Sequence, residues 1–388
     1  MLSYFWLLVS KIQKVFSDFI HRALSFFSYS TLHFTTRDLS THKKAGDLES
    51  NAPSDTPSDT SKCETYTIRL VPQKDLDLVG VGASGQVYNI NDQVVLKTCR
   101  IFEPPGDNAS QSAHWHYASD TIFHSNLLKD ERTVLQLLQS RPHRHIIAAV
   151  DVEQPEGLYL RKYRHPTVDM ISDQAHRTRL YSDITGALHH LHSLGIVHAD
   201  VRIDNILLDD QGRAILCDFS AASPCGHPNP VFPDLPLPLN GPSTTLSDAS
   251  DMFAMASLIF QMEHGAAPEL SFADGALCLP EITSGNRGLN EVIQKAWLGH
   301  YSCTSEMLQQ LNLLNAQTSH CSESTQALHD EPLEHLKDQV KVWRRNREKR
   351  FGCVLTGLLS DGQLEALAGC YGMDMSADLR FAHYHIPL

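Results

Sequence analysis

The most constraining stretch of this 388-residue chain is residues 196–220. It places His198, Asp200 and Asn205 after an apolar pair, and Asp218 at the end of a second apolar run. Two carboxylates and a carboxamide, each following a short hydrophobic segment, make an oxygen-rich set. Hard cations that accompany nucleotide phosphates prefer such oxygen ligands. The stretch therefore predicts a magnesium–nucleotide site.

A glycine-rich segment lies upstream of this stretch. Gly80, Gly82, Gly85 and Val87 follow the pattern G-x-G-x-x-G-x-V. Dinucleotide-binding turns use similar glycines, but they open directly into a helix. Here a second strand-like run follows, and after a turn a third strand-like run ends in Lys97. The pattern therefore favours consecutive strands over a dinucleotide-binding fold.

Taken in order, these motifs resemble those of the eukaryotic protein kinases. A helical pattern at residues 129–138 carries Glu131, in the place of the partner of the strand lysine. The resemblance covers residues 66–315. It implies an α+β, bilobal fold with a small β-rich N-lobe and a larger helical C-lobe. It also implies ATP as the phosphate donor, with Mg²⁺ as its companion ion.

The resemblance implies a role for each matching residue. Asp200 would orient the acceptor hydroxyl and take its proton, and Arg202 would contact the transferred phosphate. Lys97, fixed by Glu131, would position the α- and β-phosphates. The implied metal ligands are Asn205 and Asp218. The implied nucleotide-binding set is Gly80, Val81, Gly82, Ala83, Ser84, Gly85, Val87, Lys97, Glu131, Leu160 (the gatekeeper beside the hinge) and Asn205.

The chain departs from the family pattern at three places. Ala199 replaces the arginine before the catalytic aspartate, which makes this a divergent, non-RD sequence. Ser220 replaces the glycine of the metal-binding turn and restricts the backbone there. Residues 221–249 contain seven prolines and no Ala-Pro-Glu. Asp251, in contrast, is retained and is expected to anchor the catalytic-loop backbone.

The expected function is ATP-dependent phosphotransfer to Ser or Thr of an unidentified protein. Arg202 favours a hydroxyl acceptor of this kind, because Ser/Thr kinases commonly keep a lysine there. Two alternatives stay open: a nucleotide-dependent binding scaffold with little or no turnover, and a small-molecule kinase of the aminoglycoside-phosphotransferase-like branch. The glycine loop and Asp251 favour the protein kinase. Because Ala199 removes the usual phosphate receptor, activity is expected not to require phosphorylation of Ser243, Thr244, Thr245 or Ser247.

Residues 1–37 predict an amphipathic helix. Apolar side chains recur at helical spacing from Phe5 to Phe27, and basic residues such as Lys11 and Lys14 flank them. The apolar run is too interrupted for a membrane-spanning helix. Three alternatives remain: an interfacial membrane helix, a helix that docks on the kinase-like domain or a partner, and an organellar presequence. The polar residues 38–65 predict a disordered linker.

The composition and the C-terminal part add further expectations. A net charge of −13 argues against a nucleic-acid partner, and nine scattered cysteines indicate reduced thiols in a cytoplasmic protein. Association with a membrane through residues 1–30 is an alternative placement.

Residues 103–121 are expected to be an inserted loop. Residues 316–388 form a predicted C-terminal extension, whose basic helix at residues 333–350 is expected to be a solvated face, with a docking surface for an acidic partner as the alternative.

Overall fold

The computed structural model describes residues 68–82, 84–167, 171, 173–230, 240–273, 276–318 and 332–384. Within these, Ile68 and residues 105–114 belong to a small unit, and all other described residues belong to a larger one. The predicted amphipathic helix of residues 1–37 and the predicted linker of residues 38–65 lie outside the described residues.

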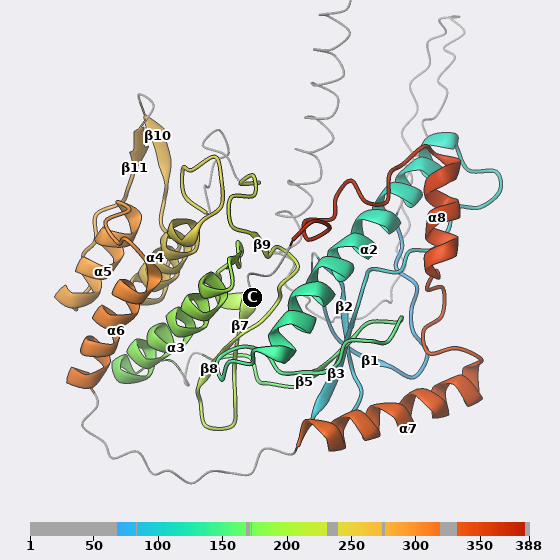
Figure 1. Ribbon diagram of the computed structural model, residues 1–388, viewed down its shortest axis with the longest axis horizontal. Helices are drawn as coiled ribbons and strands as arrows, with labels where there is room; N and C mark the ends of the chain where they lie inside the picture. The colour runs from blue at the N-terminus through green and yellow to red at the C-terminus, as the bar shows by residue number, and fades with distance from the viewer. Residues whose placement is uncertain are drawn as a thin grey trace, which may run out of the picture. The chain divides into compact units, whose positions relative to one another are not determined.

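Short strands come first in the chain and long helices follow (Figure 1). The strands are β1 (Asp77–Val81), β2 (Gln86–Asn89), β3 (Val94–Thr98), β4 (Ala149–Asp151), β5 (Leu158–Arg161), β6 (Ile196–Val197), β7 (Ile206–Leu208), β8 (Ala214–Leu216), β9 (Ser223–Pro224), β10 (Ser271–Ala273) and β11 (Ala276–Cys278). The helices are α2 (Gln111–Ser140), α3 (Gln174–Ser193), the 3-10 turn η2 (Ile203–Asn205), α4 (Asp248–His264), α5 (Arg287–Trp297), α6 (Thr304–Thr318), α7 (Leu333–Phe351) and α8 (Asp361–Cys370).

The small lobe is built on a five-stranded antiparallel sheet in the order β1-β2-β3-β5-β4. All five residues of β3 are buried, because this central strand is covered on both faces. Its register places Lys97 opposite Val87 of β2 and Leu158 of β5. Side chains that face each other across antiparallel strands share one face of the sheet. Lys97 therefore shares its face with Val87 and Leu158.

Helix α2 corrects one prediction, that of an inserted loop at residues 103–121. The helix begins at Gln111, and the Ser110 hydroxyl caps it by accepting the Ala113 N–H at 3.2 Å. From Gln111 to Ser140 the sequence contains neither proline nor glycine. Ala118 and Ile122 lie one turn apart and are buried, so this part of the predicted loop contributes to the core.

The large lobe is helical, with α4 at its centre. Met255, Ala256 and Ile259 of this helix are fully buried, as expected for a helix covered on all sides. A capping box between Ser247 and Ser250 begins it, and Gly265 ends it in the left-handed conformation at φ 77°. The α+β, bilobal fold expected from the sequence is thus confirmed.

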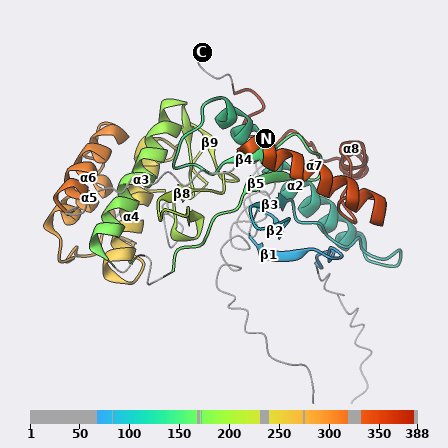
Figure 2. The ribbon, with the colours of Figure 1, turned by 90° about the horizontal axis from the view of Figure 1, so that it is seen from below.

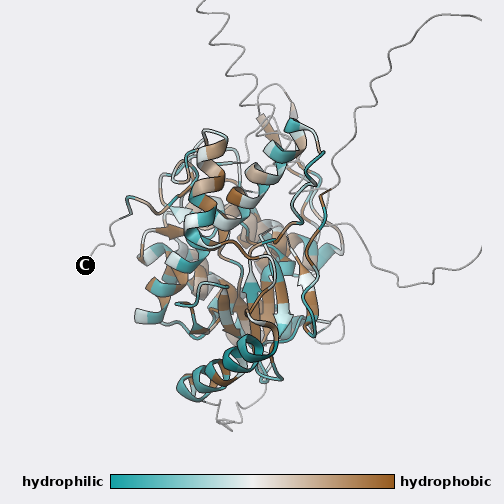
Figure 3. Cartoon of the chain, turned by 90° about the vertical axis from the view of Figure 1, so that its right-hand side faces the viewer, coloured by the Kyte–Doolittle hydropathy of each residue, from teal (hydrophilic) through white to brown (hydrophobic). Residues whose placement is uncertain are grey.

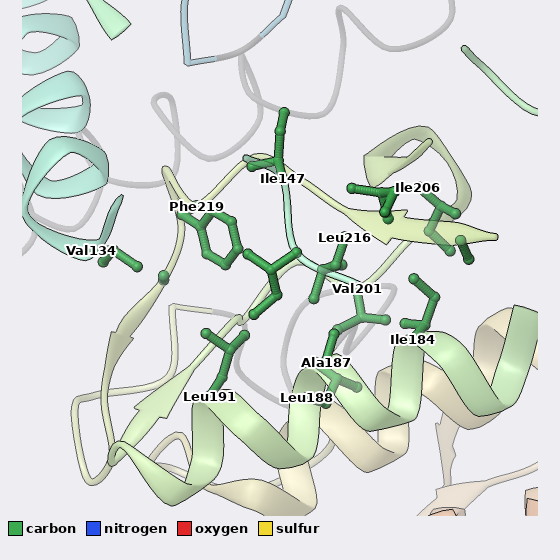
Figure 4. Close-up of a cluster of buried hydrophobic side chains, with 14 of the residues drawn as sticks. Val134, Ile147, Ile184, Ala187, Leu188, Leu191, Val201, Ile206, Leu216 and Phe219 are labelled. Carbon is green, nitrogen blue, oxygen red and sulfur yellow. The ribbon is translucent and has the colours of Figure 1, made fainter. Parts of the chain in front are cut away.

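The hydrophobic core reaches from α2 through the catalytic segments to α3. Phe219, which follows the predicted metal ligand Asp218, is fully buried. Figure 4 shows Phe219 close to Val134 of α2 and Leu191 of α3. The ring therefore links the small-lobe helix to the large lobe directly beside the predicted site.

Helix α7 was correctly predicted as a helix, but the expectation of a solvated face is only partly right. Figures 1 and 2 show α7 beside the small-lobe sheet, and most of its residues are hydrophilic (Figure 3). Leu336 and Val340 are nevertheless fully buried, and the Trp343 ring lies edge-on to Tyr159 of β5, with centroids 6.0 Å apart. Arg344 pairs with buried Glu156. The charged helix thus covers the sheet with its apolar stripe.

We expect Arg347→Ala to destabilise the protein by about 2 kcal/mol, because it leaves two carbonyls, one of them in a buried contact, without this donor. Arg347 is only 6% exposed, and it donates to the Val354 carbonyl at 2.8 Å and to the Lys74 carbonyl at 2.9 Å. The matched control is Arg345→Ala, because Arg345 is exposed on the same helix. Denaturant unfolding of both variants measures the difference. Equal losses would contradict a structural role for α7.

No helix among the described residues is long and apolar enough to cross a membrane.

Candidate active site

A buried lysine joins two carboxylates at the centre of the site. The Lys97 ammonium lies 2.7 Å from Glu131 Oε2 on α2 and 2.9 Å from Asp218 Oδ1 after β8. Glu131 also accepts the Phe219 N–H at 3.3 Å. Sequence analysis predicted all three charged residues, and the structure brings them together.

The charges in this cluster are mutually dependent. Burial alone would lower the pKa of Lys97, but Asp218 and Glu131 reverse this and hold that pKa above its ordinary value. Burial likewise opposes the charge of Asp218, yet Lys97 and Ser220 keep its pKa below the usual range. Burial raises the pKa of Glu131, although Lys97 opposes the rise. The ionised forms of Lys97 and Asp218 are therefore favoured at neutral pH.

The turn that carries Asp218 is held by its own side chains. Asp218 adopts φ 61°, a left-handed conformation that is uncommon for a residue with a side chain. The Ser220 hydroxyl and amide both donate to Asp218 Oδ1, at 2.6 and 3.2 Å. Ser220 itself is not among the described non-glycine residues with positive φ. Serine is therefore compatible with the backbone of this turn, although the sequence had led us to expect that Ser220 restricts it.

Asp251 anchors the backbone of the predicted catalytic loop, which runs from His198 to Asn205. This residue is fully buried and accepts the backbone N–H groups of His198 at 2.7 Å and Ala199 at 2.9 Å, as predicted. His192 of α3 lies 2.8 Å from the same carboxylate. Burial opposes the charge of Asp251, but the contact with His192 holds its pKa below the ordinary value. The anchor keeps Ala199 in a left-handed conformation at φ 62° just before Asp200.

Asp200 and Asn205 form a hydrogen-bonded pair at the end of this loop. The Asn205 amide donates to the Asp200 carboxylate at 2.8 Å and to the Asp200 carbonyl at 2.9 Å. Burial raises the pKa of Asp200, and the neighbouring charge of Asp218 acts in the same direction. Arg202 lies nearby and is half-buried, and its side chain pairs with Asp204. In the part of the chain that the structure describes, the Arg202 side chain is hydrogen-bonded to Asp204 and not to Asp200.

The glycine-rich loop contacts the turn that carries Asp218. The Gly82 amide donates to the Gly85 carbonyl at 2.9 Å, and the Ser84 hydroxyl lies 3.3 Å from Asp218 Oδ2. A Cβ at Gly85 would lie 2.1 Å from the Thr98 carbonyl oxygen, so only glycine fits there. Sequence analysis did not identify Arg100, whose guanidinium donates to the Gly82 carbonyl at 2.6 and 2.9 Å.

The remaining predicted nucleotide contacts lie on strands β1, β2 and β5 of the small-lobe sheet. Gly80 and Val81 are exposed on β1, and Val87 shares the sheet face of Lys97. Leu160 is buried and pairs with Val95, two residues before Lys97, so it lies on that same face. Ala83 lies outside the described residues.

The donor set fits a hard divalent cation that also binds phosphate. Among the described residues, no group of three or more His, Cys, Asp or Glu side chains forms a metal site. One ionised carboxylate, at Asp218, and one carboxamide oxygen, at Asn205, are available instead. Mg²⁺ commonly takes one or two protein oxygens and completes its shell with phosphate oxygens and water. The site therefore suits magnesium bound together with a nucleotide.

The five-stranded sheet, the Lys97–Glu131 pair and the turn that carries Asp218 are together typical of a kinase fold. A family model described as "Protein kinase domain" matches residues 74–274, just over half of the chain. The chain therefore belongs to the protein kinase family.

Parts of this chain are similar to parts of several protein kinases. CBL-interacting protein kinase 22 of Oryza sativa subsp. japonica is 27% identical over 235 residues, which are 52% of this chain and 49% of that protein. NUAK family SNF1-like kinase 2 of Rattus norvegicus is 27% identical over 183 residues, 41% of this chain and 28% of that protein. Protein kinase C eta type of Mus musculus is 36% identical over 105 residues, 24% of this chain and 14% of that protein. The chain thus spans less than half of the length of each.

Proposed function

We propose that this chain is a Mg²⁺- and ATP-dependent protein kinase that phosphorylates Ser or Thr. The observation that carries the proposal is the Lys97 ammonium held at 2.7 Å from Glu131 and 2.9 Å from Asp218. This lysine–glutamate pair and the metal-binding aspartate must both be in place for phosphate transfer in this family. The names of two relatives, a serine/threonine-protein kinase of Schizosaccharomyces pombe and a serine/threonine-protein kinase-like protein of Arabidopsis thaliana, support the acceptor class.

The chemistry that these residues would perform is positioning and proton transfer. Lys97 would hold the α- and β-phosphates, while Asp218 and Asn205 would hold Mg²⁺, which neutralises phosphate charge when bound. Asp200 would orient the acceptor hydroxyl and take its proton while the new oxygen–phosphorus bond forms. The bond between the γ-phosphorus and the bridging oxygen breaks, and ADP leaves. The raised pKa of buried Asp200 suits it to accept that proton.

A transfer assay with γ-labelled ATP tests this function. The acceptor panel contains acidic and basic Ser/Thr proteins, a tyrosine-containing polymer and aminoglycosides, each with and without Mg²⁺. We expect Mg²⁺-dependent label on Ser or Thr. Label on aminoglycosides alone would support a small-molecule kinase. Nucleotide binding without any transfer would support the scaffold alternative.

We also expect phosphatase treatment to leave the rate unchanged. The described parts of residues 221–249, the activation segment, are joined by two backbone hydrogen bonds: the Leu246 N–H donates to the His227 carbonyl at 2.8 Å, and the Asn229 N–H donates to the Thr244 carbonyl at 3.0 Å. Ala199 also removes the usual arginine that would receive a phosphate. Comparing rates before and after treatment, with phosphorylation checked by mass spectrometry, decides the matter. A large drop would show that another basic residue receives a phosphate.

A further inference from the structure

The segment after α8 returns to the active site. Figure 1 shows this segment passing along α2 toward β9. The Asn126 amide of α2 donates to the Met375 carbonyl at 3.0 Å. Phe381 is buried, and the Tyr384 hydroxyl donates to the Leu194 carbonyl just after α3. Residues 375–384 therefore bridge the small-lobe helix and the large lobe.

Arg380 is the centre of this bridge. Its Nε lies 3.1 Å from Asp130 Oδ2, and its backbone N–H donates to the same carboxylate at 3.1 Å. The Phe381 N–H lies 3.4 Å from that carboxylate as well. Asp130 is 2% exposed and the Arg380 side chain 16%, so this ion pair is largely buried and has several hydrogen bonds. Losing one member of such a pair is strongly unfavourable.

The second end of the Arg380 guanidinium reaches the metal-binding turn. Its Nη2 donates to the carbonyl of Ser220, two residues after Asp218. Asp130 and Glu131 are consecutive on α2, and Glu131 accepts the Phe219 N–H of the same turn. The turn is thus tied to α2 at two adjacent points, directly through Glu131 and through Arg380 from Asp130.

The activation segment lies close to the same guanidinium. Burial and the positive charge of Arg380 both lower the pKa of His227. His227 pairs through its carbonyl with Leu246. Arg380 therefore contacts both α2 and the metal-binding turn, and its charge acts on His227 of the activation segment.

We propose that Arg380 is a positioning residue that fixes the metal-binding turn against α2 and so keeps Asp218 on Lys97. This inference rests on the proposed function. The inference extends the proposed function in one respect. The C-terminal segment of the chain orders the site, and a phosphate on the activation segment is not needed for this. In this proposal Arg380 has no contact with the nucleotide or the acceptor, and it acts through Asp130 and Ser220.

The test compares Arg380→Gln, Arg380→Lys and a control in the full chain. Isothermal titration with a non-hydrolysable ATP analogue and Mg²⁺ should show about tenfold weaker binding for R380Q, since a charged hydrogen-bond bridge is lost. R380K should lose less, because lysine keeps the charge toward Asp130 but cannot bridge two acceptors at fixed geometry. The control R350Q removes an exposed arginine of α7 paired with Asp75 and should bind like wild type.

Hydrogen exchange separates positioning from simple packing. R380Q should exchange faster only at residues 126–135 and 217–222, and saturating Mg²⁺–nucleotide analogue should restore much of the protection, because the ligand favours the assembled state. The exchange of α4 and α6 should stay unchanged. If R380Q unfolds as a whole, R380K decides by the same criteria.

Two outcomes would overturn the proposal: wild-type affinity and exchange in R380Q, or faster exchange that spreads evenly over both lobes. If the wild-type chain binds no nucleotide, the proposed function fails, and the exchange pattern still decides the role of Arg380.

Discussion

Asp200→Asn is expected to lower phosphate transfer by about 10²- to 10⁴-fold, the usual contribution of a positioned general base. Asparagine keeps the size of the side chain and its place beside Asn205, 2.8 Å away. It cannot accept the proton of the acceptor hydroxyl. The variant also removes a carboxylate that burial and the charge of Asp218 disfavour. Its thermal stability should therefore equal or exceed that of the wild type.

The matched control for this prediction is Asp210→Asn. Asp210 is an exposed aspartate that follows β7 and pairs with Arg164 at the surface. This variant should transfer phosphate at the wild-type rate. Initial rates at saturating ATP for the three proteins make the comparison. Wild-type activity in D200N would remove Asp200 from the chemistry.

Lys97→Met is expected to lower phosphate transfer by about a hundredfold or more, because it removes the cation that positions the phosphates. It also leaves Glu131 and Asp218 without their shared partner, at 2.7 and 2.9 Å in the wild type. Breaking a buried pair in this way costs about 3–5 kcal/mol unless the remaining carboxylate takes up a proton. Rate and unfolding measurements on the same samples separate the two effects.

The stability loss in K97M should depend on pH. Burial already raises the pKa of Glu131 above 4.5, and Lys97 opposes that rise. Without Lys97 the pKa of Glu131 in the folded state rises further. A group with a raised folded-state pKa stabilises the fold at pH values below its unfolded pKa, and this contribution is lost as the pH climbs through the folded pKa. The unfolding free energy of K97M should thus fall further behind that of wild type as the pH rises from the ordinary pKa of Glu, 4.5, through the raised pKa of Glu131.

Lys129→Met serves as the control for K97M. Lys129 lies on α2, two residues from Glu131, and its side chain is 37% exposed and paired with Asp361 at the surface. Its stability difference from wild type should be small and nearly constant with pH. A constant deficit in K97M would contradict the coupling of Lys97 to Glu131.

The sequence predicted which residues lie together in the candidate site, because they belong to short motifs whose spacing follows the local backbone. Lys97 lies near the end of a buried strand, and Asp218 follows another, so hydrophobic runs indicated their positions. Asp251 was identified from the family resemblance, which places an aspartate at the start of this strongly hydrophobic helix. Local pattern is sufficient where the functional group sits at the end of a regular element.

The predictions failed or were silent where distant segments meet. The first turns of α2 looked like a loop because Pro104, Pro105 and Gly106 precede them and histidines fill them. Arg380 and Asp130 lie 250 residues apart, and no local pattern connects them. Arg100 reaches back 18 residues to the Gly82 carbonyl in a contact between side chain and backbone. Such contacts depend on tertiary packing, and local sequence patterns do not predict which distant residues meet.

Calorimetric binding of ATP with and without Mg²⁺ to wild type, K97M and D200N tests the proposed site most directly. The arrangement of Lys97 and Asp218 predicts that wild type and D200N bind Mg²⁺–ATP with similar affinity, because Asp200 serves the acceptor. It predicts that K97M binds at least about tenfold more weakly, and that omitting Mg²⁺ weakens wild type as well. Binding by K97M equal to that of wild type, or no binding by wild type, would contradict the site.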